Sequence, residues 1–199
     1  MKRYISLILA HPTAGSFNHA IAQTAVDRLH GLGHAVWFHD LYAEPFDPIV
    51  PAAEIPKCAP LPPAIQQHCD EICAADGIVI VHPNWWSQPP AILKGWVDRV
   101  LRPGLAYNFV EDGQGGAKPI GLLKARVACV ITTANTPQEK EVAFLGDPLE
   151  VFWRKVVFGL CGVSNVQRLI FSPVIVRQLE QRRQWLQQVE TAMDQLLPS

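Results

Sequence analysis

Short apolar runs alternate with longer amphipathic stretches along the sequence, and no other feature restricts the fold as much. Runs rich in β-forming residues predict strands at residues 4–9, 35–39, 77–81, 125–131 and 166–171. Helical spacing of apolar residues predicts helices at residues 17–32, 64–75, 90–101, 147–160 and 178–197. Strands that alternate with helices form a parallel sheet. We therefore expect a single α/β domain over residues 1–199, an open five-stranded parallel sheet with helices on both faces.

The sequence also indicates how two loops and the last helix are arranged. Residues 40–63 are rich in proline and residues 102–124 in glycine, and both are predicted as irregular loops. Because a long ordered loop is often functional or packed, the part between Pro45 and Pro63 is expected to pack at an interface between two copies of the chain. The last helix is expected to bury a stripe of apolar residues. The stripe consists of Leu179, Trp185, Leu186, Val189, Met193 and Leu196.

Charge and hydropathy exclude several classes of protein. The 17 Lys and Arg residues nearly balance the 18 Asp and Glu residues, and the net charge is −1. This balance gives no electrostatic basis for binding nucleic acid or an anionic membrane. The apolar run near the N-terminus is short and has no cleavage-like site, so it is interpreted as a buried strand and not as a signal peptide. No apolar run approaches the ~20 residues that an integral membrane segment needs.

The cysteines indicate a reducing compartment. Five cysteines, an odd number, occur without an export signal, which is typical of reduced thiols in a cytoplasmic protein. Cys69 and Cys73 share one face of a predicted helix, and His68 is adjacent. A metal site needs more convergent ligands than these. We therefore expect no metal and interpret both cysteines as small apolar residues.

The loop after the first strand can bind an anion. It contains Gly15 and Ser16 and leads into a helix that begins at Phe17 and Asn18, while His11 directly follows the strand. The first N–H groups of a helix are unpaired and the helix dipole favours a phosphate there. The loop has neither a P-loop nor a GxGxxG pattern, which weakens nucleoside triphosphate and NAD-Rossmann interpretations. Ser16 can equally be a helix N-cap and nothing more.

The loop after the third strand carries two neighbouring tryptophans. His82 and Pro83 end the strand, and Asn84, Trp85, Trp86 and Ser87 follow. Neither tryptophan is expected in the core, since large aromatic side chains on a loop are typical of sites for flat ligands or partners. The helix that follows contains Gly95, which costs about 1 kcal/mol relative to Ala and predicts close backbone packing against another element.

The loop after the fourth strand adds small polar side chains. Thr132 and Thr133 can donate hydrogen bonds to a polar ring edge, although they also suit an ordinary turn. In an open parallel sheet, ligands bind beyond the carboxyl ends of the strands. The three loops therefore predict one pocket with a phosphate end, an aromatic wall and a hydrogen-bonding floor. A flavin fits this description.

In these loops and over nearly its whole length, the chain resembles the flavodoxin-like NAD(P)H:quinone oxidoreductases. This group includes mammalian quinone reductases, bacterial modulator-of-drug-activity proteins and ancillary subunits of glutathione-gated potassium efflux. The most specific match is Pro83-x-x-Trp86 followed by Pro90-Ala91-Ile92-Leu93-Lys94-Gly95-Trp96-Val97-Asp98-Arg99-Val100. Further matches are Ala10-His11-Pro12, Ser16-Phe17-Asn18, Asp40-Leu41-Tyr42, Phe46-Asp47-Pro48, Gly104-Leu105-Ala106-Tyr107, Thr132-Thr133 and Cys161-Gly162.

The resemblance implies a flavodoxin-like fold and a two-electron flavoenzyme that passes a hydride from NAD(P)H to a quinone-like acceptor. It also implies a homodimer with each active site at the subunit interface. Tyr107 and Phe109 would reach over the partner's substrate, and with Trp86 they are the expected catalytic residues. The implied cofactor-binding residues are His11, Ser16, Phe17 and Asn18 at the phosphate-bearing tail, Pro83, Asn84, Trp85, Trp86 and Ser87 along the ring, and Thr132 and Thr133 at its pyrimidine edge.

One departure from the family pattern leaves questions open. Mammalian members carry a Tyr and a His after the Thr-Thr pair, whereas residues 134–146 here contain Glu139, Glu141 and Leu145 and neither of those residue types. The charge relay that the Tyr and His are proposed to form in mammalian members is therefore not expected in this chain. The family divides between FAD and FMN, and the chain has no clear adenine-binding extension, which favours FMN. Trp86 matches the family's tryptophan, so it is expected to line the ring, whereas Trp85, at a position where relatives vary, is expected to pack outward or at the dimer seam.

Two other functions remain as alternatives. A one-electron flavodoxin-type carrier is disfavoured by the net charge of −1, since such carriers are usually strongly acidic. A redox-sensing regulatory subunit of a transporter would use the Pro-rich segment as its binding surface.

Overall fold

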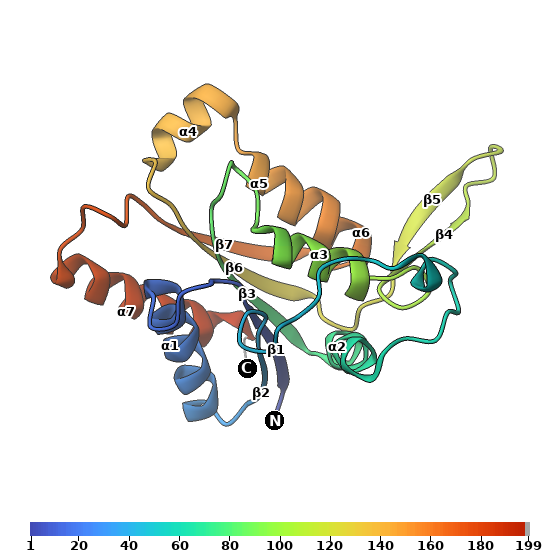
Figure 1. The fold of residues 1–199 in the computed structure, drawn as a ribbon, viewed down its shortest axis with the longest axis horizontal. Helices are drawn as coiled ribbons and strands as arrows, with labels where there is room; N and C mark the ends of the chain where they lie inside the picture. Colours follow the sequence, from blue (N-terminus) through green and yellow to red (C-terminus); the bar gives the residue numbers. More distant parts are fainter. Residues whose placement is uncertain (198–199) are drawn as a thin grey trace.

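The computed structural model describes residues 1–197 and contains the predicted parallel sheet (Figure 1). The strand order is β2-β1-β3-β6-β7, and every neighbouring pair is parallel. This is the flavodoxin-like α/β arrangement, in which the order reverses between β1 and β3. The strands span Tyr4–Leu9 (β1), Ala35–Asp40 (β2), Gly77–Pro83 (β3), Asn165–Phe171 (β7) and Val127–Thr133 (β6). The fold prediction is confirmed.

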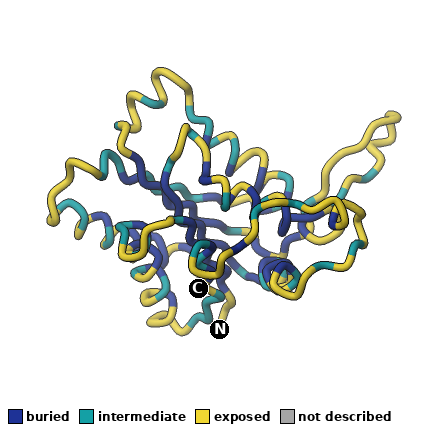
Figure 2. Tube along the Cα trace, viewed as in Figure 1, coloured by how far each residue is buried: buried dark blue, intermediate teal, exposed yellow. Residues whose placement is uncertain are grey.

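Helices cover both faces of the sheet because each face carries its own apolar core. On one face, α1 (Phe17–Gly31) and α7 (Leu179–Leu196) pack against the inner strands through residues such as Ile21 and Val189. On the other face lie α2 (Pro63–Ala74), α3 (Ala91–Val100) and a helix made of α5 (Pro148–Glu150), the π-helical η2 (Val151–Phe158) and α6 (Gly159–Cys161). Residues of β3 are buried throughout, so the central strands form the darkest part of Figure 2.

Four elements were not predicted: two strands, one helix and one short turn. The glycine-rich segment 102–124 contains an antiparallel hairpin of β4 (Tyr107–Glu111) and β5 (Ala117–Gly121), which projects from the body of the molecule (Figure 1). The helix α4 (Gln138–Leu145) buries none of its residues, so it has no apolar stripe by which a helix is recognised. The Pro-rich segment also holds one short 3₁₀ turn, η1 (Ala52–Glu54). The expectation that Leu179 is buried was wrong, because its side chain is 65% exposed at the start of α7.

The Pro-rich segment is held against α3 by direct backbone contact and by buried charges. A Cβ on Gly95 would lie 2.3 Å from the Pro48 carbonyl oxygen, which confirms the close approach predicted for this glycine. Four residues after Gly95, the Arg99 guanidinium donates to both carboxylate oxygens of Glu54, at 3.1 Å and 2.5 Å, and both side chains are buried. Arg102 donates to the Glu54 carbonyl. The segment is therefore an integral part of the fold.

Cys69 is buried beside α3, as expected for a small apolar residue, and Cys73 is partly buried. Among the helices described over residues 1–197, none has both the length and the apolar character to cross a bilayer.

Candidate functional site

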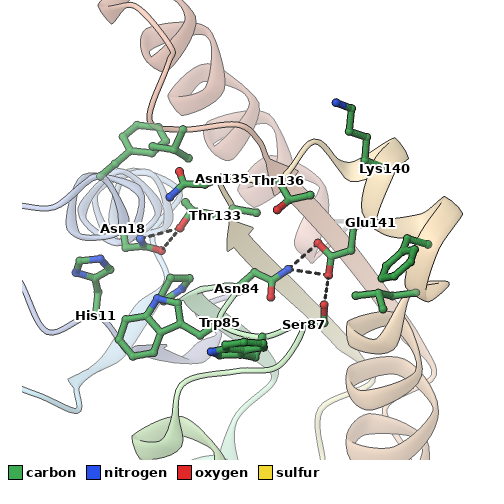
Figure 3. Close-up of a pocket in the computed structure, with 17 residues that line it drawn as sticks. His11, Asn18, Asn84, Trp85, Ser87, Thr133, Asn135, Thr136, Lys140 and Glu141 are labelled. Atoms are coloured by element: carbon green, nitrogen blue, oxygen red, sulfur yellow. Dashed lines mark hydrogen bonds between the residues drawn. The ribbon is translucent and has the colours of Figure 1, made fainter.

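A pocket of about 930 Å³ lies beyond the carboxyl ends of β1, β3 and β6 (Figure 3). The register of the sheet brings the three loops together: the Ala10 N–H donates to the Val81 carbonyl, and the Asn84 N–H donates to the Thr133 carbonyl at 2.7 Å. Nine of the residues predicted from sequence line the pocket. They are His11, Phe17, Asn18, Pro83, Asn84, Trp85, Trp86, Ser87 and Thr133.

The phosphate end of the predicted site is the N-terminus of α1. Ser16 caps the helix: its Oγ accepts from the His19 N–H at 3.4 Å and lies 2.8 Å from His19 Nδ1. His19 Nε2 in turn lies 3.1 Å from the Asp40 carboxylate. The Ser16 side chain is thus engaged within the loop and is absent from the pocket lining, although the helix N–H groups after it remain suited to an anion.

Hydrogen bonds join the residues of the pocket floor. Asn18 is buried, and its Nδ2 donates to Thr133 Oγ1 at 2.9 Å, which joins α1 to the end of β6. His11 stands beside this pair and accepts a hydrogen bond from the Thr13 N–H at 3.1 Å. Burial lowers the pKa of His11 below its usual value, so its imidazole is neutral at pH 7.

The aromatic wall is a tight turn in a conformation unusual for its residues. The Trp85 N–H donates to the Gln88 carbonyl and the Gln88 N–H to the Trp85 carbonyl, both at 3.0 Å. Between them, Trp86 and Ser87 have φ of 54° and 57°, in the left-handed region that costs non-glycine residues energy. Trp85 is 43% and Trp86 99% exposed, which confirms that neither belongs to the core.

A second wall of the pocket was not predicted. It comes from α4 and the loops beside it, which contribute Asn135, Thr136, Lys140, Glu141, Phe144, Leu145 and Val174. Glu141 faces the tryptophan turn across the pocket (Figure 3): its carboxylate accepts from Asn84 Nδ2 at 2.9 and 2.8 Å and from Ser87 Oγ at 2.7 Å. The only signal in the sequence was that α4 closely follows the Thr132-Thr133 pair.

Thr132 lies behind the pocket. Successive residues of a strand face opposite sides, so Thr133 reaches the pocket and Thr132 does not. Thr132 Oγ1 lies 3.4 Å from Nε2 of the fully buried His82, which also accepts from Trp153 Nε1 at 3.0 Å. The other ring nitrogen, Nδ1, donates to the Pro83 carbonyl at 2.8 Å. Burial lowers the pKa of His82 to about 4, so this ring supports the pocket wall as a neutral group.

Tyr107 and Phe109 do not line the pocket of their own chain. They lie on β4, with ring centroids 5.8 Å apart, and Phe109 is 53% exposed. Their predicted role over a partner's pocket stays a prediction.

One group of side chains in the described part of the chain has the spacing of a metal site, although not the one considered from sequence. Ligand atoms of His39, Glu44 and His68 lie within 4.8 Å of one another. Their nitrogens already have protein partners: His39 Nδ1 and Nε2 lie 2.9 Å from Glu44 and 2.6 Å from Glu71, and His68 Nδ1 accepts from Trp96 Nε1 at 3.2 Å. With Nδ1 as an acceptor, neutral His68 carries its proton on Nε2 and offers no lone pair there. The group therefore acts as a hydrogen-bonded link between the end of β2 and α2.

Comparisons with known proteins agree with this geometry. A family model described as a flavodoxin-like fold matches residues 4–197. An uncharacterised NAD(P)H oxidoreductase of Haemophilus influenzae is 36% identical over 172 residues, which cover 84% of this chain and 83% of that protein. The solved NAD(P)H:quinone oxidoreductase of Methanothermobacter marburgensis has a TM-score of 0.83 at 26% identity and covers 99% of this chain and 100% of its own. An FMN-dependent NADH-azoreductase of Bacillus anthracis, solved with FMN, shares the fold, with a TM-score of 0.77 at 16% identity over 98% of this chain and all of its own.

Proposed function

The chain belongs to the flavodoxin-like fold family of NAD(P)H:quinone oxidoreductases, and we propose that it passes a hydride from NAD(P)H to a quinone-like acceptor by way of a bound flavin. The observation that carries the proposal is the pocket itself. It lies at the carboxyl ends of the central strands and combines the α1 N-terminus, the tryptophan turn and a hydrogen-bonding floor. These are the three features that a flat, phosphate-bearing ring requires.

The residues present fit a flavin. A volume of about 930 Å³ lies in the upper part of the usual range for ligand pockets, roughly 300–1,000 Å³, and leaves space for a second flat ligand beside a ring. The anion-binding position is a single helix N-terminus, which suits the single phosphate of FMN. A protein of this fold binds FMN. FMN is therefore the favoured cofactor of the proposal, with FAD as the second choice.

The protein's own part in the reaction is to bind, orient and exclude water. A bound flavin would supply hydride-transfer chemistry. His11, Phe17 and Asn18, with the α1 N–H groups, would hold the phosphate-bearing tail, and Thr133 would approach the polar edge of the ring. Pro83, Asn84, Trp85, Trp86 and Ser87 would form the wall along it. The helix dipole and the free N–H groups of the first turn of α1 would supply the main attraction for the phosphate.

A homodimer is part of the proposal. Phe109 is half exposed on a projecting hairpin, a position from which it and Tyr107 would cover the pocket of a second copy. Ile49 and Ile55 of the Pro-rich segment are also exposed, at 72% and 70%, and would lie in such an interface.

Extraction of the cofactor tests the function directly. Purified protein, or protein incubated with FMN and FAD, is expected to bind flavin, identified by mass, and to oxidise NADH or NADPH when a benzoquinone is added. A panel of quinones, azo dyes and nitro compounds then identifies the acceptor class. A colourless protein that takes up neither flavin would refute the proposal.

Substitution of the two tryptophans tests the division of roles in the wall. Trp86→Ala is expected to lower kcat/KM for the quinone about tenfold, which corresponds to loss of roughly 1.4 kcal/mol of aromatic contact. Trp85→Ala is expected to have a smaller effect: both side chains line the pocket, but Trp86 is the one that matches the family's tryptophan. Steady-state kinetics of the two variants measure the difference, and equal losses would show that the division is wrong.

A further inference from the structure

Glu141 joins the two walls of the pocket, and this contact has a role beyond those already described. We propose that Glu141 is a positioning residue that sets the width and shape of the acceptor-binding space. Its carboxylate ties the Asn84–Gln88 turn to α4, so the tryptophan wall and the α4 wall stay at a fixed separation. The inference rests on the proposed function for the identity of the ligand, but the contact it describes exists in the protein alone.

The turn needs an external restraint. Trp86 and Ser87 are consecutive non-glycine residues with positive φ, and each costs of order 1 kcal/mol in that region. The base of the turn is fixed, because the Asn84 N–H donates to the Thr133 carbonyl of the pocket floor. Its tip is held by Glu141, which accepts a hydrogen bond from Ser87 Oγ at 2.7 Å. A hydrogen bond contributes about 0.5–1.5 kcal/mol net even to an uncharged acceptor, so the bond from Ser87 together with those from Asn84 Nδ2 is enough to offset the strain.

The helix α4 needs the same restraint for a different reason. None of its residues is buried, and Phe144 and Leu145 are 87% and 51% exposed. Over residues 1–197, the side-chain hydrogen bonds from α4 to other elements all come from Glu141. Apolar packing therefore holds this helix weakly, and the carboxylate is its main attachment to the pocket wall opposite.

The two walls together define the kind of acceptor. Trp85 and Trp86 line one side, and Phe144 and Leu145 line the other, so the space between them is bounded mainly by apolar surface. The Glu141 charge is engaged by Asn84 and Ser87 and does not stand free in the pocket. Such a space selects flat apolar acceptors whose thickness matches the separation that Glu141 maintains.

Three variants isolate the contact. Glu141→Ala removes the hydrogen bonds and one negative charge. Glu141→Gln removes the charge but keeps an oxygen that can accept from Asn84 and Ser87. Glu139→Ala is the matched control, since Glu139 lies exposed on the same helix outside the pocket lining and its loss removes the same charge. All three should fold, because α4 buries no side chain.

Two readouts separate this inference from the proposed function. In protein without added ligands, amide hydrogen exchange of the segments holding Asn84–Gln88 and α4 is expected to quicken at least about tenfold in Glu141→Ala, as expected for loss of about 1.4 kcal/mol of local stability. The exchange rates of Glu141→Gln should stay within about threefold of those of wild type, and the rates of Glu139→Ala should equal those of wild type. In the presence of flavin, Glu141→Ala should raise the KM for a quinone about tenfold and change kcat less than about threefold.

Each alternative result is decisive. Wild-type exchange in Glu141→Ala would overturn the inference whether or not the protein binds flavin. A Glu141→Gln variant as impaired as Glu141→Ala would show that negative charge, and not hydrogen bonding, is the property that matters, and this would also overturn it. Faster exchange in Glu141→Ala together with no flavin binding by wild type would leave the contact intact and refute the proposed function.

Discussion

The Gly95→Ala variant is expected to lose about 3 kcal/mol or more of its free energy of unfolding. The new Cβ would lie 2.3 Å from both the Cβ and the carbonyl oxygen of Pro48, and real Cβ contacts are longer than 3.0 Å. Pro48 is part of a backbone that cannot rotate away, so the whole segment must move. That movement displaces Glu54 from Arg99, and breaking a buried ion pair costs about 3–5 kcal/mol. Most domains have only about 5–15 kcal/mol of stability in total.

Urea denaturation of Gly95→Ala and wild type measures this loss. Gly31→Ala is the matched control, because Gly31 is also a helical glycine and a Cβ there would meet nothing within 4 Å. That control is expected to be as stable as wild type or slightly more so, since Ala is the better helix former. If Gly95→Ala unfolds at the urea concentration of wild type, the Pro-rich segment does not pack against α3 as described.

Acid is expected to destabilise the protein well above the pH at which carboxylates are protonated. Burial lowers the pKa of His82 and His68 to about 4 in each case, whereas an unfolded histidine titrates near 6.5. Between these two values the unfolded chain binds more protons than the folded one, so stability falls as the pH decreases from 6.5 to 4. Each histidine contributes up to about 1.4 kcal/mol per pH unit in this window.

The free energy of unfolding at pH 7.5, 6, 5 and 4.5 tests this expectation. In His82→Gln the amide can donate to the Pro83 carbonyl and accept from Trp153, as the imidazole does, but it does not titrate. Below pH 6, the free energy of unfolding of the variant should therefore fall less steeply with decreasing pH than that of wild type. The difference in slope should correspond to about one proton fewer taken up on unfolding. Identical slopes in the variant and wild type would mean that His82 is not held neutral by burial.

The sequence predicted the elements whose apolar residues face a core, and it missed those whose residues do not. The five strands were found because they are short apolar runs rich in β-forming residues, and the inner three (β1, β3 and β6) are almost completely buried. The place of the pocket followed from the carboxyl ends of these three strands. The helix α4 has no buried residue and therefore no periodic signal. The β4–β5 hairpin was hidden by glycines such as Gly113, whose positive φ forms the turn at its tip.

In the site, too, some residues could be predicted from the sequence and others could not. Trp85, Trp86 and Thr133 were assigned to the pocket from their positions at strand ends, and all three line it. Glu141 could not be assigned, because its partners Asn84 and Ser87 lie 57 and 54 residues away in the sequence and only the fold brings them together. Thr132 was grouped with Thr133, but the alternation of a strand turns it toward His82. Contacts of this kind depend on tertiary structure.

A helix that buries none of its own side chains also has an evolutionary consequence. Substitutions at Lys140, Phe144 or Leu145 remove little apolar surface from a core, so selection for stability constrains them weakly. The same residues line the pocket. Descendants of this chain can therefore change the pocket lining through α4 while the sheet beneath it keeps its sequence.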